Sequence, residues 1–107
     1  SGVMEGEIWV VKTTLPKSWL EFKVVSFAQE LVEQGAACIQ HYAVTSTYSW
    51  EGSVQSEQEW ALSVKVSNSH KDKIVEIISK SHPYDVPQII CSQHSTSEEY
   101  GNWVNSQ

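Results

Sequence analysis

The stretch Ser81–Ile90 has the sequence Ser-His-Pro-Tyr-Asp-Val-Pro-Gln-Ile-Ile, and its two prolines divide a helix from a strand. Each proline fixes its own φ angle and disfavours the helical conformation in the residue before it. We therefore expect a helix to end near Lys80 and a strand to begin only after Pro87. The stiffened connector between them carries an imidazole, a phenol and a carboxylate, which belong to His82, Tyr84 and Asp85. It is either a candidate binding site or simply the stop between helix and strand.

Hydrophobic spacing predicts the elements on either side of this connector. Four aliphatic residues before it form the buried stripe of a helix: Ile74, Val75, Ile77 and Ile78. Ser69 begins a capping-box pattern at the start of this helix. After the connector, Gln88–Gln93 is predicted to form a short strand. Glu98–Val104 is predicted to form a small terminal helix that brings Tyr100 and Trp103 onto the body.

The N-terminal third predicts one strand and one helix. Glu7–Thr14 is an apolar, β-branched run ahead of Pro16, which is typical of a central strand buried on both faces. The next segment, about Ser18–Gln34, is predicted to be an amphipathic helix capped by Ser18 and ended by Gly35 in the left-handed conformation. Its apolar residues recur at helical spacing: Leu20, Val24, Phe27, Ala28 and Leu31.

A long β-hairpin is predicted in the middle of the chain. Ala37–Trp50 lacks glycine and proline and is rich in β-branched and aromatic residues. Glu51-Gly52-Ser53 then supplies a turn. In the return strand four large apolar residues alternate with small or polar ones: Trp60, Leu62, Val64 and Val66. The opposite face of that strand carries Lys65, which should point away from the helices.

The order strand, helix, strand, strand, helix, strand, followed by a short C-terminal helix, is the split βαβ or ferredoxin-like pattern. It predicts an α+β sandwich with an antiparallel sheet and helices on one face. The other face should be polar, but Tyr42, Val44, Tyr48 and Trp50 share one face of the second strand, and Ile39 and Ala43 lie on the opposite one. Both faces therefore require cover. With five tryptophans in 107 residues, we infer self-association through the bare sheet face and the hairpin.

Composition places the chain in a single domain spanning residues 1–107, with residues 1–6 as a flexible N-terminal segment. Thirteen acidic residues oppose seven lysines and no arginine, and the formal net charge is -6. This charge disfavours nucleic-acid and anionic-membrane binding. No apolar run approaches the roughly 20 residues that a membrane-spanning helix needs. We expect a cytoplasmic protein.

The two cysteines, Cys38 and Cys91, are distant in sequence and flanked by apolar residues, a pattern of buried thiols. In a ferredoxin-like sheet the second and fourth strands lie at opposite edges. This separation exceeds the limit of roughly 7 Å between the Cα atoms of a disulfide. We predict that the two thiols are not bonded to each other.

Five blocks of the sequence resemble, in order and spacing, the CutA family of divalent-cation tolerance proteins. They are His-Pro-Tyr-x-Val-Pro-x-Ile in the connector, Thr13-Thr14-Leu15-Pro16, Ala36-Ala37-Cys38-Ile39, Ser46-x-Tyr48-x-Trp50-Glu51-Gly52, and Glu59 leading to Lys65. The resemblance covers Ile8 to about Val104. It implies a compact homotrimer of the ferredoxin-like fold, in which hairpins and terminal strands extend sheets between subunits.

The sequence does not predict an enzyme. It contains no Gly-x-Ser-x-Gly, His-Glu-x-x-His or Gly-rich phosphate loop. An acylphosphatase of this fold would also require an arginine that clamps phosphate, and the chain has none. A non-enzymatic binding or signalling module is therefore expected.

The family resemblance implies binding of copper or another divalent cation, with His82 as the metal ligand because it is the histidine inside a matched motif. Some bacterial relatives carry cysteine at the position of Thr13 and a second histidine at the position of Ser81. Copper favours sulfur and imidazole ligands, so we expect weak binding here and no essential cofactor. The other histidines, His41, His70 and His94, are interpreted as surface or strand residues.

The alternative is a trimeric regulatory protein with no physiological metal role, which binds a small ligand or a partner segment. Aromatic walls with one cation and carboxylates are typical of a pocket for a small polar ligand. The candidates are Tyr48, Trp50, Glu59, Lys65, Tyr84, Asp85 and Trp103, with His82 at the mouth of a pocket between subunits. A simpler possibility is that Glu59 pairs with Lys65 while the aromatic residues seal the interface.

Overall fold

The computed structural model describes residues 3–107, and within this range four strands and three helices follow one another as β-α-β-β-α-β-α. The elements are β1 (Gly6–Pro16), α1 (Glu21–Glu33), β2 (Cys38–Trp50), β3 (Ser53–Val66), α2 (Asn68–Ser81), β4 (Ile90–Thr96) and α3 (Glu98–Asn105). Of the segment expected to precede the fold, residues 1–2 lie outside the described range. Gly6 already belongs to β1.

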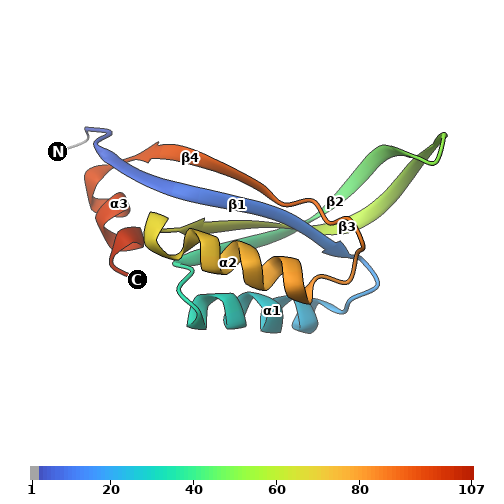
Figure 1. Ribbon diagram of the computed structural model, residues 1–107, viewed down its shortest axis with the longest axis horizontal. Coiled ribbons are helices and arrows are strands. Elements are labelled where there is room, and N and C mark those ends of the chain that lie inside the picture. The colour runs from blue at the N-terminus through green and yellow to red at the C-terminus, as the bar shows by residue number, and fades with distance from the viewer. Residues whose placement is uncertain (1–2) are drawn as a thin grey trace.

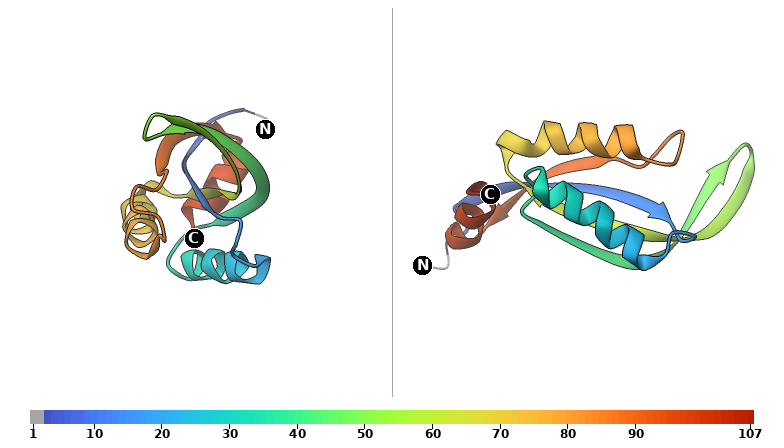
Figure 2. Two further views of the ribbon diagram at one scale, coloured as in Figure 1. Left: turned by 90° about the vertical axis from the view of Figure 1, so that its right-hand side faces the viewer. Right: turned by 90° about the horizontal axis from the view of Figure 1, so that it is seen from below.

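The strands form one antiparallel sheet in the order β2-β3-β1-β4, which confirms the predicted split βαβ arrangement. Helices α1 and α2 lie side by side against one face of this sheet (Figures 1 and 2). β1 is paired on both sides, as predicted for a central strand. Because β2 and β4 are the two edges, Cys38 and Cys91 lie three strands apart, and both thiols are free, as predicted. The expectation that both thiols are buried is wrong, since Cys38 is only partly buried and Cys91 is exposed.

The main core lies between the sheet and the two long helices. Leu62, Val64 and Val66 of β3 are 1%, 0% and 0% exposed, so the predicted apolar face of this strand is the face covered by the helices. Val11 and Leu15 of β1 lie on the same face, because they pair with Val64 and Trp60. The helices contribute the aliphatic residues that complete this layer: Val24, Leu31, Ile74 and Ile78. We call this face the covered face.

The opposite face of the sheet is covered only at one end, where α3 lies against β1. Val104 of α3 packs with Ile8 and Val10. Two glycines allow this close approach: a Cβ atom on Gly101 would lie 2.9 Å from the Cα atom of Gly6. Tyr100 and Trp103, which we expected on the body, are instead 38% and 46% exposed and pack against each other. The rest of this surface, here called the open face, has no helix over it among the described residues (Figure 1).

The β2–β3 hairpin continues beyond the helices and bends toward the side of the open face (Figure 1). Its register is unbroken from the pair Cys38 and Lys65 to the pair Trp50 and Ser53. The turn residues Glu51 and Gly52 both have positive φ angles, 49° and 81°. Two positive φ angles are typical of the type I′ turn that fits the right-handed twist of a hairpin.

The element ends differ from the prediction in detail. The N-cap of α1 is Leu20 rather than Ser18, because the backbone N–H of Trp19 donates to Pro16 and keeps this segment in a turn. The N-cap of α2 is Ser67, so the capping box predicted at Ser69 is wrong. At the end of α1, Gly35 has a φ angle of 119° and the following amide donates back into the helix, as predicted. The last strand begins two residues later than expected, at Ile90.

Candidate functional site

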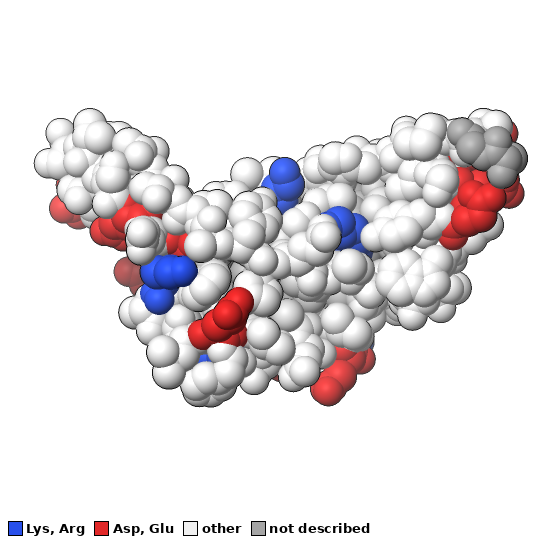
Figure 3. Space-filling view, turned by 180° about the vertical axis from the view of Figure 1, so that it is seen from behind, with Lys and Arg blue, Asp and Glu red and all other residues white. Residues whose placement is uncertain are grey.

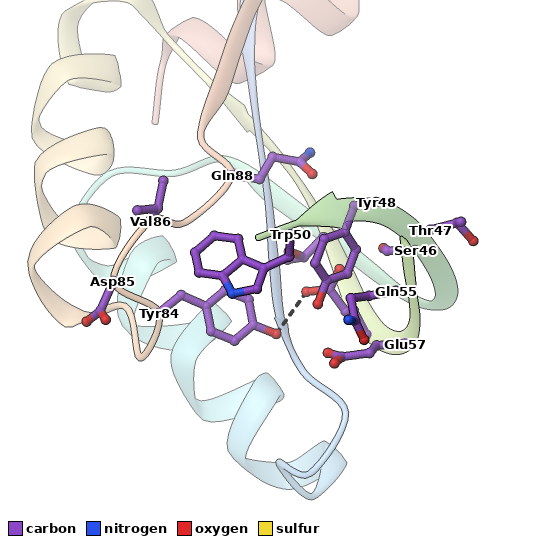
Figure 4. A pocket seen from close by; sticks show the side chains of 12 residues that line it. Ser46, Thr47, Tyr48, Trp50, Gln55, Glu57, Tyr84, Asp85, Val86 and Gln88 are labelled. Carbon is purple, nitrogen blue, oxygen red and sulfur yellow. Dashed lines mark hydrogen bonds between the residues drawn. The ribbon is translucent and has the colours of Figure 1, made fainter. Parts of the chain in front are cut away.

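A pocket of about 850 Å³ lies where the hairpin bends away from the sheet. The strand β2 contributes Tyr48 and Trp50, β3 contributes Glu57 and Glu59, and the connector between α2 and β4 contributes Tyr84 and Asp85. Figure 4 shows these side chains around a common space, with Asp85 and Glu57 on either side of the aromatic rings. We call this cavity the bend pocket.

Strand alternation explains why these side chains meet. The covered face of β3 carries Trp60 and Leu62, so Glu57 and Glu59 point to the open face. Tyr48 and Trp50 of β2 point the same way, because the strand pairing is continuous. The bend of the hairpin makes this surface concave, and the connector closes its base.

His82 fixes the connector to the end of β1. Its Nε2 atom lies 2.7 Å from the carbonyl oxygen of Thr14, and its Nδ1 atom accepts the backbone N–H of Tyr84 at 3.1 Å. A backbone amide can only donate, so the proton of the neutral ring must be on Nε2. Burial lowers the pKa of His82 below its ordinary value, against the opposing effects of the Thr14 carbonyl and Glu59. The neutral ring with this tautomer therefore holds two backbone segments together.

Tyr84 connects the connector to the hairpin. Its hydroxyl donates to Oε2 of Glu59 at 2.8 Å (Figure 4, dashed line). Burial first, and then the hydrogen bond and charge of Glu59, raise the pKa of the Tyr84 phenol. The phenol therefore stays protonated and keeps donating, which orients the Glu59 carboxylate. The ring of His82 lies 4.9 Å from that of Tyr84, so imidazole, phenol and carboxylate form one continuous cluster.

The charge of the bend pocket is entirely negative in the described structure. Its lining residues include Glu57, Glu59 and Asp85, and none of the described lining residues is a lysine, arginine or histidine. Figure 3 shows acidic side chains at the base of the protruding hairpin. The pKa of Tyr48 is raised, by burial first and then by Glu57 and Glu59, which places this phenol in the same negative environment.

The structure brings together five of the seven residues predicted to line a ligand pocket and separates the other two. Lys65 is six positions from Glu59 along β3 and lies opposite Val10 of β1. Its ammonium group donates a hydrogen bond to the side-chain oxygen of Gln40. The expectation that Glu59 pairs with Lys65 is therefore wrong. The even spacing that puts both residues on one face of β3 also puts them far apart along the strand. Trp103 lies in α3, at the other end of the sheet from the hairpin (Figure 1).

Several lining residues were missed by the sequence interpretation. Glu57 is the most important of them, because it adds a second carboxylate from β3. The signal was present, since Glu57 and Glu59 are two apart and must share a strand face. Thr14 was quoted only as part of a motif, although its side chain lines the pocket and its carbonyl accepts from His82.

The residues around His82 do not form a ready metal site. Both ring nitrogens already have hydrogen-bond partners, so a metal would have to displace Thr14 or Tyr84. Within residues 3–107, no three His, Cys, Asp or Glu side chains are grouped closely enough to hold a metal ion together. The hydroxyl of Thr13 is buried without a hydrogen-bond partner in the described structure. The prediction that His82 binds metal is not favoured by this geometry.

Comparison with known sequences identifies close similarity to one family. Residues 9–107 match the profile described as CutA1 divalent ion tolerance protein. The divalent-cation tolerance protein CutA of Thermotoga maritima is 29% identical over 89% of this chain and 93% of the relative. A probable cutA homolog of Encephalitozoon cuniculi is 39% identical, over 66% of this chain and 63% of that relative's length.

Comparison with solved structures identifies the same family. CutA1 of Thermus thermophilus is 34% identical, with a TM-score of 0.81 over 94% of this chain and 96% of that one. A PII-like protein CutA from Nostoc is 30% identical, with a TM-score of 0.79 over 92% and 94% of the two chains. A CutA of Archaeoglobus fulgidus described as periplasmic is 22% identical and shows the fold alone. Within the described residues, no helix is long and apolar enough to cross a membrane. This chain belongs to the CutA1 divalent ion tolerance family.

Proposed function

We propose that the protein acts as a homotrimer in divalent-cation tolerance, and that it works by binding rather than by catalysing a reaction. The observation that carries this proposal is the open face of the sheet, together with the hairpin that extends it. Tyr42, Trp50 and Val54 are 51%, 53% and 79% exposed on these strands. A monomer that exposes such an aromatic and aliphatic surface usually covers it by association.

The tryptophans support self-association through these parts of the chain. Trp9 and Trp60 donate their indole N–H groups to Asn68 and to the Trp19 carbonyl, so their polar atoms are satisfied within the chain. Trp50 and Trp103 are about half exposed at opposite ends of the molecule. In a trimer, the hairpin of one subunit can cover the open face of the next.

Copper is the metal expected from the family, and His82 is its expected contact. Binding there has to break the hydrogen bond to Thr14 or the one from Tyr84. We therefore propose weak copper binding that competes with the connector's own structure. Tolerance would then depend on the assembled protein more than on tight storage of the ion.

A second candidate function is favoured by the bend pocket. It is a trimeric regulatory module that responds to a small ligand, with no physiological metal role. The size of the pocket is typical of small-molecule sites, which enclose roughly 300–1,000 Å³. The Nostoc relative, which is described as PII-like, has the same fold.

Growth in copper separates these functions. Cells lacking the gene should be more sensitive to copper, and both the wild-type protein and His82→Ala should be compared for rescue. If metal contact at His82 is part of the function, only the wild type restores growth, and calorimetry shows saturable copper binding lost in the variant. Equal rescue and equal copper binding by both proteins would contradict a role for His82 and favour the regulatory module.

A further inference from the structure

The bend pocket has a composition that selects the charge of its ligand. Three carboxylates line it, those of Glu57, Glu59 and Asp85, and no basic residue is among the described lining residues. An anion such as a nucleotide or a dicarboxylate would be repelled, because nothing in the lining neutralises it. The net charge of the whole chain, -6, adds to this preference. This composition favours a ligand that carries positive charge.

The aromatic rings of the pocket favour an organic cation as the ligand. The faces of three other tryptophans in this chain are covered by the chain's own ammonium groups. Lys17 lies 3.5 Å from the ring centre of Trp60, Lys23 lies 4.2 Å from Trp19, and Lys71 lies 4.1 Å from Trp9. Among the described residues no lysine is placed over Trp50, which is 53% exposed and lines the pocket. An alkylammonium ligand can make the same cation–π contact there.

The pocket suits an extended amine better than a compact metal ion. A metal requires several ligands that converge on one point, and within residues 3–107 no such group of three side chains exists. The carboxylates are distributed around the aromatic rings instead, with Asp85 and Glu57 on either side (Figure 4). A flexible chain with several ammonium groups can approach these carboxylates separately while its methylene groups contact the rings.

Glu59 is already oriented for such a ligand. The Tyr84 hydroxyl holds one of its oxygens, which leaves the other lone pairs free to accept from an ammonium group. The hydroxyl of Tyr84 and the side chains of Thr14 and Gln88 add neutral polar groups to the lining.

We propose that the bend pocket binds a small aliphatic polyamine, held by the carboxylates of Glu57, Glu59 and Asp85 and by the rings of Trp50 and Tyr84. This inference rests on the proposed function in one respect: the assembled protein must leave the pocket open. It assigns the regulatory candidate a class of ligand.

Calorimetry of the protein with spermidine tests the proposal. We expect saturable binding with one site per chain. Triethylene glycol, a neutral chain of similar length, and ATP should not bind at the pocket. Hexaamminecobalt(III) carries the same charge as spermidine without a methylene chain, and we expect it to bind at least about tenfold more weakly, because it cannot contact the aromatic rings as an alkyl chain does.

Three variants locate the site. Glu59→Gln keeps an acceptor for Tyr84 but removes the charge, and Trp50→Leu removes the aromatic face. Each should weaken spermidine binding by at least about tenfold, the size expected for losing a charge-assisted contact. Glu30→Gln, on the exposed surface of α1, changes the net charge equally and should leave the affinity unchanged. Circular dichroism and light scattering on each variant confirm that fold and assembly are intact.

The outcomes separate this inference from the proposed function. Absence of saturable spermidine binding by a trimeric wild type would overturn the polyamine site and leave the assembly proposal standing. Equal weakening by Glu30→Gln and Glu59→Gln, or equal affinity for hexaamminecobalt(III), would also overturn it, because binding would then reflect net charge alone. A protein that binds spermidine as expected but stays monomeric would support the site and contradict the trimer.

Discussion

The inner and outer parts of the β2–β3 hairpin share one continuous register but differ in how far their side chains are buried. In the inner part, Leu62 and Val64 are buried under α1 and α2. In the outer part, beyond the helices, Trp50 and Val54 are largely exposed and carboxylates line the concave side. The same alternation therefore builds a core where helices cover it and a recognition surface where they do not.

The largest expected effect on stability comes from a substitution in the inner part of the hairpin, which the helices cover. Leu62→Ala removes a side chain that is 1% exposed and should lower the free energy of unfolding by about 2–5 kcal/mol, because the core cannot fully close the cavity. Gln58→Ala is the matched control, since this exposed residue is on the same strand and the same face but lies four residues farther out. It should cost less than about 0.5 kcal/mol. Equal effects in urea unfolding would contradict the distinction between the two parts.

Gly101→Ala tests α3, which covers part of the open face. The added Cβ atom would lie 2.5 Å from Oγ1 of Thr96 and 2.9 Å from Cα of Gly6, so α3 must shift away from β1. We expect a net loss of about 1–2 kcal/mol in unfolding free energy, after the helix preference of alanine is included. Asn102→Ala, at an exposed neighbouring position in α3, should be neutral or slightly stabilising. A stabilising Gly101→Ala would show that α3 does not pack as described.

The stability of the protein should depend on pH through His82, which lies on the connector beside the bend of the hairpin. Burial lowers the pKa of His82 in the folded protein, so the unfolded chain takes up its proton at a higher pH than the folded chain does. The contribution of His82 to the free energy of unfolding should therefore be fully present above the ordinary histidine range near 6.5. The free energy of unfolding should fall as the pH decreases from there toward the lowered pKa.

This pH effect can be isolated by comparing two proteins. Protonated His82 carries a proton on Nδ1 and can no longer accept the N–H of Tyr84, which should release the connector. His82→Gln retains the other three histidines, so its unfolding free energy should depend less on pH below 6.5 than that of the wild type. Parallel pH profiles in thermal or urea unfolding would rule out His82 as the source.

The smallest expected effect is a gain on the covered face. The hydroxyl of Thr13 is buried without a partner in the described structure, and an unsatisfied buried polar group costs stability. Thr13→Val keeps the shape and removes that group, so we expect a gain of about 1 kcal/mol. The same change at the exposed Thr45 should alter stability by less than about 0.5 kcal/mol. A destabilised Thr13→Val would mean that the hydroxyl does have a hydrogen-bond partner.

The sequence predicted the order of the elements, the central strand and the turn at Gly52, because periodicity and turn chemistry are local properties. It also predicted that Lys65 points away from the helices. The grouping of Lys65 with Glu59 was wrong because six residues along one extended strand already place the two side chains far apart. The position of the bend could not be predicted, because neither Cys38–Trp50 nor Ser53–Val66 contains a glycine or proline that would mark it.

Helix starts were the least predictable local feature. Ser18 and Ser69 are chemically suitable caps, but the tertiary structure begins the helices at Glu21 and Asn68. At the site, the motif residues His82 and Tyr84 of the connector lie with their ring centres 4.9 Å apart. Their hydrogen bonds to Thr14 and Glu59 could not be foreseen, because they join segments that are distant in sequence.

The central claim is that other copies of the same chain cover the open face and the hairpin outside the bend pocket. Multi-angle light scattering of the wild-type protein after size-exclusion chromatography, at micromolar concentration, tests this claim most directly. We predict a single species with three times the mass of one chain, and a shift toward the mass of one chain in the folded Val54→Glu variant, whose charge lies on the exposed hairpin. A monodisperse wild-type monomer would contradict the claim.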